Sequence, residues 1–384
     1  MLWMFSVLRP CSNVVQQCRA IHRASDRLQF WMRFPIVFFL LLPVCSGQEA
    51  VRFPQNPLIA TASSPSLGDD INGPSVIRVP AWIPHPMGRY YMYFAHHRGD
   101  HIRLAYADSL SGPWKIYEPG VLNVRDTEFY RPQPDPPLSL YKGFDVYNTL
   151  YTHVASPEVY IDDEHRQLVM FVHGLYTAGK KWPVDPKEAS QWLRDNSFAQ
   201  YTQATVSRDG VHFDARPGIT AKTSYERVFR WRGTWYSMSR LGLLGRSNTL
   251  LGVFETGPNP FAGSAYAGRV RHVGLVLRGD TLYVFFSAIG DSPERILLSK
   301  VALNGDWRGW KASDAQEVLA PQEAYECAGL PPVASKPGEI EGPERALRDP
   351  GLIEDGGKVV LFYSFCGEQG IAAADVTQFA RSVP

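Results

Sequence analysis

Residues 348–376 read R-D-P-G-L-I-E-D-G-G-K-V-V-L-F-Y-S-F-C-G-E-Q-G-I-A-A-A-D-V, and this stretch decides the fold. A polar pair, Arg348 and Asp349, precedes a short apolar strand at 350–353. The turn at 355–358 contains two glycines, which tolerate the positive φ of a tight hairpin. Residues 359–364 are rich in β-branched and aromatic side chains, and residues 371–376 continue the apolar pattern. The stretch therefore predicts a β-meander of three strands.

The same three-strand pattern occurs four more times along the chain. An internal period of roughly sixty residues, each unit a small antiparallel sheet, is the sequence signature of a propeller. We therefore predict an all-β, five-bladed β-propeller. The expected strands of the other units are 74–77, 90–94 and 102–107; 157–161, 168–173 and 201–206; 227–231, 235–240 and 250–254; and 273–277, 282–287 and 296–303.

The N-terminal stretch is expected to lie outside the fold. Residues 34–44 form an apolar run that is too short to span a bilayer comfortably, with Arg33 before it and Ser46-Gly47 after it. This pattern predicts a secretory signal peptide over residues 1–47, and Met32 is an alternative true start. An uncleaved anchor or a lipid-anchored Cys45 stays open. We expect a secreted or periplasmic protein whose residues 48–384 form a single propeller domain.

Composition limits the partners. A formal net charge of +1 on 384 residues predicts no general affinity for nucleic acid or for anionic membranes. We expect a monomer with no membrane contact after signal cleavage. The expected mature part holds two cysteines, Cys327 and Cys366, and export permits a disulfide between them; two buried free thiols are the alternative.

Three segments between the expected strands have predicted roles. Residues 51–67 form a Pro- and Ser-rich lead-in that is expected to lie along the last blade and help close the ring. The run D-P-K-E at 185–188 has an N-cap acid, a proline at the first helical position and a following glutamate, which predicts a short helix. The long connection at 125–151 is either functional or a rigid crossing between blades.

Polar residues recur at the starts of the predicted first strands, which line the channel of a propeller and converge at one end. Any single one is explained by solvent exposure or an ion pair between blades, but recurrence in several repeats favours a shared site. The residues are Asp70, Asn72, His153, Glu158, Glu226, Arg227, Arg271, His272, Arg348 and Asp349. His96 and His97, after the second strand of the first unit, add cationic or proton-transfer capacity, although an exposed strand edge also explains them.

These residue types indicate two kinds of chemistry. Carboxylates that face each other across a channel can act as general acid and base on a glycosidic bond, with burial separating their pKa values. Arginines beside histidines can receive a carboxylate or a sulfate. Both sets are present in this chain.

The first unit resembles the opening blade of five-bladed glycoside hydrolases of families 43 and 32, which include arabinanases, β-xylosidases and invertases. The resemblance rests on G-P-S-V-I at 73–77, G-R-Y-Y-M-Y-F at 88–94, I-R-L-A-Y-A at 102–107 and G-P-W at 112–114, and it covers essentially residues 70–376. The segments at 153–159, 271–286 and 348–353 look more closely like a group of secreted, uncharacterised proteins related to those hydrolases.

The chain departs from the hydrolase pattern at two positions. The family has an aspartate general base directly before a proline in blade one, where this chain has Gly73, and an Ala-Pro-Asp in blade two, where this chain has Ser156-Pro157-Glu158. The Asp-Pro pair stands instead in blade five, at Asp349-Pro350. The resemblance places Glu226 near the general acid and implies a central Ca²⁺ near His272, with no organic cofactor.

Three functions are compatible with these patterns. The first is a glycoside hydrolase acting on plant or algal oligo- or polysaccharides, with Asp349 as base, Glu226 as acid and Glu158 as modulator. Its substrate-binding residues would be His153, Arg271, His272, Arg348, His96 and His97. The second is a polysaccharide lyase in which His153 or His272 abstracts the proton α to a uronate carboxylate that arginine neutralises. The third is a sugar-binding propeller without catalysis, which Gly73 favours.

Overall fold

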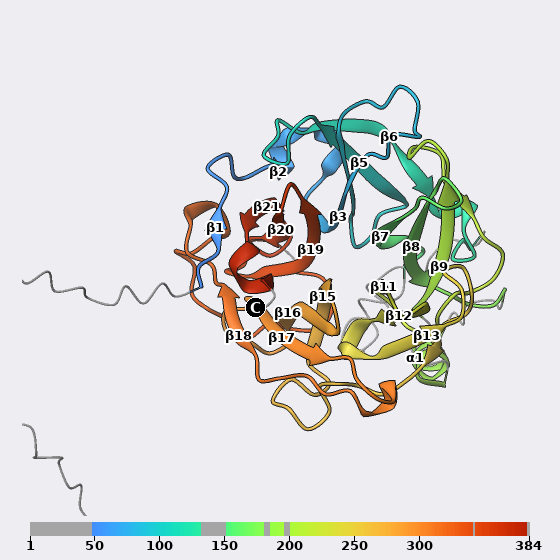
Figure 1. The fold of residues 1–384 in the computed structure, drawn as a ribbon. Helices are drawn as coiled ribbons and strands as arrows, with labels where there is room; N and C mark the ends of the chain where they lie inside the picture. Colours follow the sequence, from blue (N-terminus) through green and yellow to red (C-terminus); the bar gives the residue numbers. More distant parts are fainter. Residues whose placement is uncertain (1–47, 132–150, 180–184, 196–199, 341, 382–384) are drawn as a thin grey trace, which may run out of the picture. The chain divides into compact units, whose positions relative to one another are not determined.

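Five antiparallel sheets surround a central axis in the computed structural model, which describes residues 48–131, 151–179, 185–195, 200–340 and 342–381 (Figure 1). The prediction of an all-β, five-bladed propeller is confirmed. The expected signal peptide and most of the connection at 125–151 lie outside the described residues.

Four of the blades consist of four strands in chain order, and the first strand of each lies nearest the axis. Blade one holds β3 (Asn72–Arg78), β4 (Tyr90–Ala95), β5 (His101–Ala107) and β6 (Lys115–Asn123). Blade two holds β7 (Ala155–Asp162), β8 (Gln167–Leu175), β9 (Gln200–Ser207) and β10 (Asp214–Ala215). Blade three holds β11 (Arg227–Trp231), β12 (Thr234–Met238), β13 (Leu244–Ser247) and β14 (Glu255–Thr256). Blade four holds β15 (Val270–Arg278), β16 (Thr281–Ala288), β17 (Ile296–Ala302) and β18 (Gln316–Leu319).

Blade five combines both ends of the described chain. From the axis outward, its first three strands are β19 (Leu347–Asp355), β20 (Lys358–Phe365) and β21 (Gly370–Asp375). Its outer edge consists of β1 (Val51–Arg52) and β2 (Ile59–Ala60), which both pair antiparallel with β21. The expectation that the lead-in segment closes the ring is therefore confirmed.

The predicted helix is present as α1 (Pro186–Asp195). Asp185 caps it, because its Oδ1 accepts hydrogen bonds from the backbone N–H groups of Lys187 and Glu188 at 2.9 and 3.0 Å. No helix in the described ranges is both long and apolar enough to cross a membrane.

The expected strand at 250–254 in blade three is wrong. Leu241 and Gly242, with φ of 66° and 79°, turn the chain tightly after β12, so the third strand begins already at Leu244. Leu250 and Phe254 are buried in the core between blades two and three, where the Phe254 ring lies 6.2 Å from that of Phe171. Their burial explains why an irregular segment carries the apolar pattern of a strand.

Four of the five inner strands have a bulge near their starts. The pairing register shifts between Asn72 and Ser75 in β3, and equivalent shifts occur in β7, β15 and β19. Ser156 and Asp349, at the bulges of β7 and β19, have φ of 46° and 52°, a region that non-glycine residues rarely adopt. A bulge re-aims side chains at the end of a strand, so this end of the channel is built to present particular residues.

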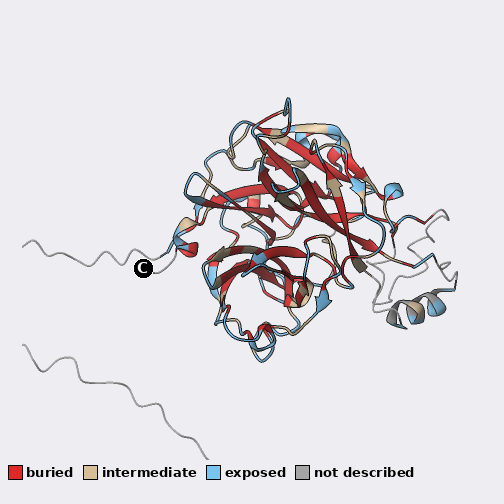
Figure 2. Cartoon of the chain, turned by 45° about the vertical axis from the view of Figure 1, so that its right-hand side comes forward, coloured by how far each residue is buried: buried red, intermediate tan, exposed pale blue. Residues whose placement is uncertain are grey.

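The inner strands approach one another closely around the axis. The Ser75 hydroxyl of β3 donates to Glu158 of β7, and Arg227 of β11 donates to the Val273 carbonyl of β15. Between β19 and β3, a Cβ added at Gly351 would lie 2.1 Å from the Pro74 carbonyl oxygen, so only glycine fits there. Figure 2 shows the strands largely buried and the exposed residues mostly in the connecting loops. The side chains at this end of the channel are thus held by rigid, closely packed strands.

Candidate functional site at the channel mouth

The channel mouth consists of the starts of β3, β7, β11, β15 and β19 together with the loops that follow β4, β8, β12, β16 and β20. These segments lie at one end because the first and second strands of each blade run antiparallel. Several charged and imidazole side chains gathered there are buried, including His153, His272, Arg271, Arg348 and Asp349.

A row of rings crosses the mouth from blade two to blade four. The ring centroids of His153 and His173 are 5.9 Å apart, those of His173 and Tyr225 are 4.1 Å apart, and those of Tyr225 and His272 are 4.0 Å apart. The row ends in blade five, where Asp349 pairs with the His272 Nδ1 atom. The structure therefore places His153, His272 and Asp349 along one row of side-chain contacts.

Asp349 is held as a carboxylate. Burial alone would raise its pKa, but the neighbouring His272 and the positive charge of Arg348 outweigh burial and hold the pKa well below the usual range. The Ser364 hydroxyl donates a hydrogen bond of 2.8 Å to Asp349 Oδ2 and fixes its orientation. The Nε2 atom of His272 is buried with no hydrogen-bond partner among the described residues.

Glu226 has the opposite electrostatic character. Its side chain is buried at the start of blade three, next in sequence to Tyr225, and one oxygen accepts a hydrogen bond from the Thr223 hydroxyl. Burial raises the pKa of Glu226 to about 7, and hydrogen bonding to Ser237 and Thr223 offsets only part of this rise. Close to neutral pH this carboxyl therefore keeps a proton in a substantial fraction of molecules.

Glu158 lies beyond the bulge of β7, deeper along the inner strands than the ring row. Its Oε2 lies 3.3 Å from the Arg227 guanidinium and accepts a hydrogen bond from Ser75. Burial raises the pKa of Glu158, and the charge of Arg227 opposes that rise. These contacts join Glu158 to the seams between the first three blades.

The two predicted binding arginines already have carboxylate partners. Arg271 Nε lies 2.7 Å from Glu294 Oε1, and Arg348 Nε lies 2.9 Å from Glu294 Oε2. Arg348 also lies 3.4 Å from Glu368, and both arginines donate to the Gly338 carbonyl of the loop before β19. All four side chains are buried. A sugar-binding role for these arginines stays a prediction, and in this structure their guanidinium groups hold blades four and five together.

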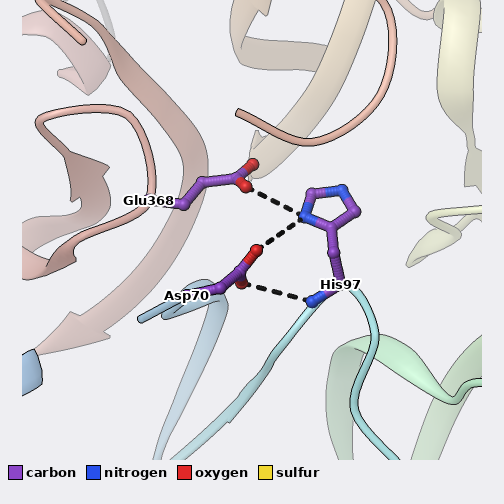
Figure 3. Close-up of side chains that lie close together, drawn as sticks. All are labelled: Asp70, His97 and Glu368. Atoms are coloured by element: carbon purple, nitrogen blue, oxygen red, sulfur yellow. Dashed lines mark hydrogen bonds and ion pairs between the residues drawn. The ribbon is translucent and has the colours of Figure 1, made fainter. Parts of the chain in front are cut away.

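The two histidines of blade one point to different partners. His97 Nδ1 lies 3.0 Å from Glu368 Oε2 and 3.5 Å from Asp70 Oδ2, at the seam between blades one and five (Figure 3). His96 Nε2 instead lies 3.6 Å from the exposed Asp69. His97 therefore joins the mouth through Glu368, whereas these contacts give His96 a separate surface pair.

Four mouth residues are absent from the sequence prediction, namely His173, Tyr225, Glu294 and Glu368. Three of them end or follow second strands, a position at which the prediction considered only His96 and His97. Because the first two strands of each blade are antiparallel, the end of the second strand lies beside the start of the first, and this rule could have predicted His173, Glu294 and Glu368.

Cys327 and Cys366 form a disulfide, which fixes the turn that carries Glu368.

The residues around His272 do not fit the calcium site that the resemblance implies. Ca²⁺ takes roughly six to eight oxygen ligands, and Asp349 is the one carboxylate that contacts His272 in the described part of the chain. The His272 ring also lies beside that of Tyr225, with the two centroids 4.0 Å apart. We therefore derive no step from a calcium ion at this position.

Solved structures with a similar fold are glycoside hydrolases by name, although no family model matches the chain. One is a structure described under the GH130 family of mannoside phosphorylases, which contains glycoside hydrolases that target β-1,2-mannosidic linkages in Candida mannan. Its sequence is 10% identical to this chain, and the two folds superpose with a TM-score of 0.53 over 87% of this chain and 95% of that chain. A putative glycoside hydrolase from Bacteroides ovatus is 13% identical with a TM-score of 0.52, over 85% of this chain and 95% of that chain. At these identities the likeness shows the fold alone.

A curated relative covers nearly the whole sequence. The uncharacterized protein R118 of Acanthamoeba polyphaga mimivirus is 32% identical over 374 residues, which cover 90% of this chain and 97% of that protein. The chain therefore belongs to the same family as R118.

Proposed function

We propose that the protein is a glycoside hydrolase in which Asp349 is the general base and Glu226 the general acid. The observation that carries this proposal is the opposite electrostatic setting of two buried carboxyls. The pKa of Asp349 is held well below its usual range, whereas that of Glu226 is raised to about 7. A base that stays ionised and an acid that stays protonated are what glycoside hydrolysis requires.

Each group has a defined part in the reaction. The protonated Glu226 donates its proton to the glycosidic oxygen as the bond from that oxygen to the anomeric carbon breaks. The Asp349 carboxylate accepts a proton from the water whose oxygen forms the new bond to the anomeric carbon. His272 Nδ1 contacts one oxygen of the Asp349 carboxylate, and the Ser364 hydroxyl donates a hydrogen bond to the second. Glu158, paired with Arg227, contributes charge deeper in the channel.

The substrate class and the location belong to the same proposal. The partly exposed Tyr225 ring, flanked by two imidazoles, offers an apolar face of the kind on which sugar rings stack. Solved structures named as glycoside hydrolases share the propeller fold, which supports carbohydrate as the substrate class. We propose oligo- or polysaccharides of plant or algal origin, degraded by a secreted enzyme.

The ring row favours a second candidate, a polysaccharide lyase with an imidazole base. His272 has a buried nitrogen without a hydrogen-bond partner in the described residues, beside the phenol-bearing ring of Tyr225. A lyase also needs a cation for the uronate carboxylate, and Arg271 and Arg348 are both paired with Glu294. This pairing makes the lyase the weaker candidate.

A panel of purified polysaccharides tests the proposal. The hydrolase predicts new reducing ends with the wild-type protein, and loss of most of that product with Glu226→Gln. Glu255→Gln is the matched control, since Glu255 is an exposed glutamate whose side chain pairs with Arg308 on the rim of the propeller. Absorbance of unsaturated uronate would establish the lyase instead. Saturable sugar binding without any product would show that the protein is a sugar-binding module and not an enzyme.

A further inference from the structure

Three side chains from distant segments meet at the seam between blades one and five (Figure 3). Asp70 precedes β3, His97 follows β4, and Glu368 lies in the turn between β20 and β21. One ligand atom from each lies within 4.8 Å of the other two. The backbone fixes this meeting, because the Ile71 N–H donates a hydrogen bond of 2.7 Å to the Glu368 carbonyl.

The Nδ1 atom of His97 is crowded by polar atoms that no single proton can satisfy. Asn72 Nδ2 lies 2.9 Å away, Glu368 Oε2 lies 3.0 Å away and Asp70 Oδ2 lies 3.5 Å away. If Nδ1 carries a proton, it can donate to a carboxylate but then faces the amide donor of Asn72. If Nδ1 carries a lone pair, it accepts from Asn72 but faces two carboxylate oxygens.

A cation at the centre of this group removes the conflict. We propose that Asp70, His97 and Glu368 bind a divalent transition metal ion, Zn²⁺ or Mn²⁺. Asn72 Nδ2 donates a hydrogen bond of 2.7 Å to Asp70 Oδ1 and so orients this carboxylate. Imidazole with carboxylates is a donor set that these metals accept.

The spacing of the donor atoms agrees with a shared ion. Ligand atoms that lie roughly 2.0–2.2 Å from one metal, at tetrahedral or octahedral angles, are about 2.8–3.6 Å apart. The distances of 3.0 and 3.5 Å around His97 Nδ1 fall within this range. The separations between His97 Nδ1 and the two carboxylates are therefore those of ligands that share one ion.

Neighbouring groups hold the ligands in place, as second partners do in metal sites. Arg348 lies 3.4 Å from the other oxygen of Glu368, and the His97 backbone N–H donates to Asp70 Oδ1 at 3.2 Å. The exposed fraction is 15% for the His97 side chain and 1% for Glu368, so access is on the side of His97.

Metal binding to the full chain tests the site directly. The protein is stripped with a chelator and titrated calorimetrically with ZnCl₂ and, separately, MnCl₂. We expect one ion per chain for at least one of the two metals. His97→Ala and Glu368→Gln should each weaken that binding at least roughly tenfold. His212→Ala is the matched control, because His212 pairs with Asp209 at 2.7 Å on an exposed surface, and it should bind like the wild type.

Each outcome decides the proposal. Absence of stoichiometric binding to the wild type, unchanged binding in both ligand variants, or an equal loss in the His212 control would overturn it. Circular dichroism checks that each variant folds. If the ligand variants unfold, the melting temperature is measured instead. Zn²⁺ or Mn²⁺ should raise the melting temperature of the wild type, and the rise should be smaller in Asn72→Ala. Activity is not needed, so this result is separate from the fate of the hydrolase proposal.

Discussion

His272 of blade four pairs through Nδ1 with the carboxylate of Asp349 in blade five, and this contact joins two buried side chains across the seam between the blades. Asp349 occupies the left-handed backbone region, with φ of 52°. Backbone strain at a buried carboxylate is common where a side chain must be presented in one orientation. The pairing therefore holds Asp349 in one orientation, as a general base of the proposed reaction requires.

Replacing Asp349 by asparagine should lower turnover by roughly 10²–10⁴-fold, the usual contribution of a general base. Sugar binding should survive, because the amide keeps one oxygen acceptor. Turnover and binding are measured separately, on whichever polysaccharide the panel identifies. Asp280→Asn, which alters an exposed aspartate paired with Arg232, serves as the control. Equal turnover in both variants would remove Asp349 from the mechanism.

The rate should depend on pH through Glu226. The acid must be protonated, and its pKa is raised to about 7, so kcat/KM should fall about tenfold per pH unit above that value. Asp349 must be ionised, and its lowered pKa places the acidic limb below the usual range of an aspartate. A pH profile of the wild type and of Glu226→Gln checks this. Persistence of the alkaline limb in the variant would assign it to another group.

Stability should depend on pH through the same residue. The folded pKa of Glu226 is about 7 and its ordinary value is 4.5, so the folded state binds more protons between these values. Its contribution to stability is complete below pH 4.5 and is lost as pH rises through 7, where ionisation costs roughly 3 kcal/mol. In urea denaturation, the free energy of unfolding of Glu226→Gln should rise relative to that of the wild type as pH increases from 4.5 to about 7. Parallel curves would mean that Glu226 is not buried as an acid.

Glu294→Gln should destabilise the fold by about 3–5 kcal/mol, because it leaves two buried guanidinium groups without their shared carboxylate. The comparison is Glu255→Gln, whose exposed pair with Arg308 should contribute less than about 1 kcal/mol. Chemical denaturation measures both free energies of unfolding. Similar values would show that the Arg271–Glu294–Arg348 network is energetically neutral.

Reduction of the Cys327–Cys366 disulfide should lower the free energy of unfolding. The bond closes a loop with a sequence separation of 39 residues, for which chain entropy predicts about 4 kcal/mol. The double variant Cys327→Ala/Cys366→Ala reports the same loss without a reductant. A wild type that melts at the same temperature with and without reductant would contradict this prediction.

The fold could be predicted because each blade repeats one local pattern, in which apolar alternation and glycine turns specify the strands. The same repetition predicted His153, His272 and Asp349, since each stands at the start of an inner strand. The third strand of blade three was misplaced because Leu250 and Phe254 are buried in a turn, and burial alone does not distinguish a strand from a packed loop.

The rest of the site depends on contacts that no local pattern encodes. Glu294 and Glu368 lie in loops, and their role follows from meeting Arg348, which belongs to a different segment. The raised pKa of Glu226 depends on how completely its neighbours exclude water. Such properties arise only when the ring closes, so the sequence predicts candidate residues but not their partners.

The pairing of β1 and β2 with β21 has a consequence for how the protein is made. Ala373 of the last strand donates a hydrogen bond to Asn56, from which it is 317 residues apart in the sequence. The final blade cannot assemble until β21 has been synthesised, so β1 and β2 must wait for a strand that lies far along the chain. Contacts of this sequence separation slow folding. An N-terminal tag fused close to Val51, or a truncation beyond it, would therefore act on the outer edge of blade five.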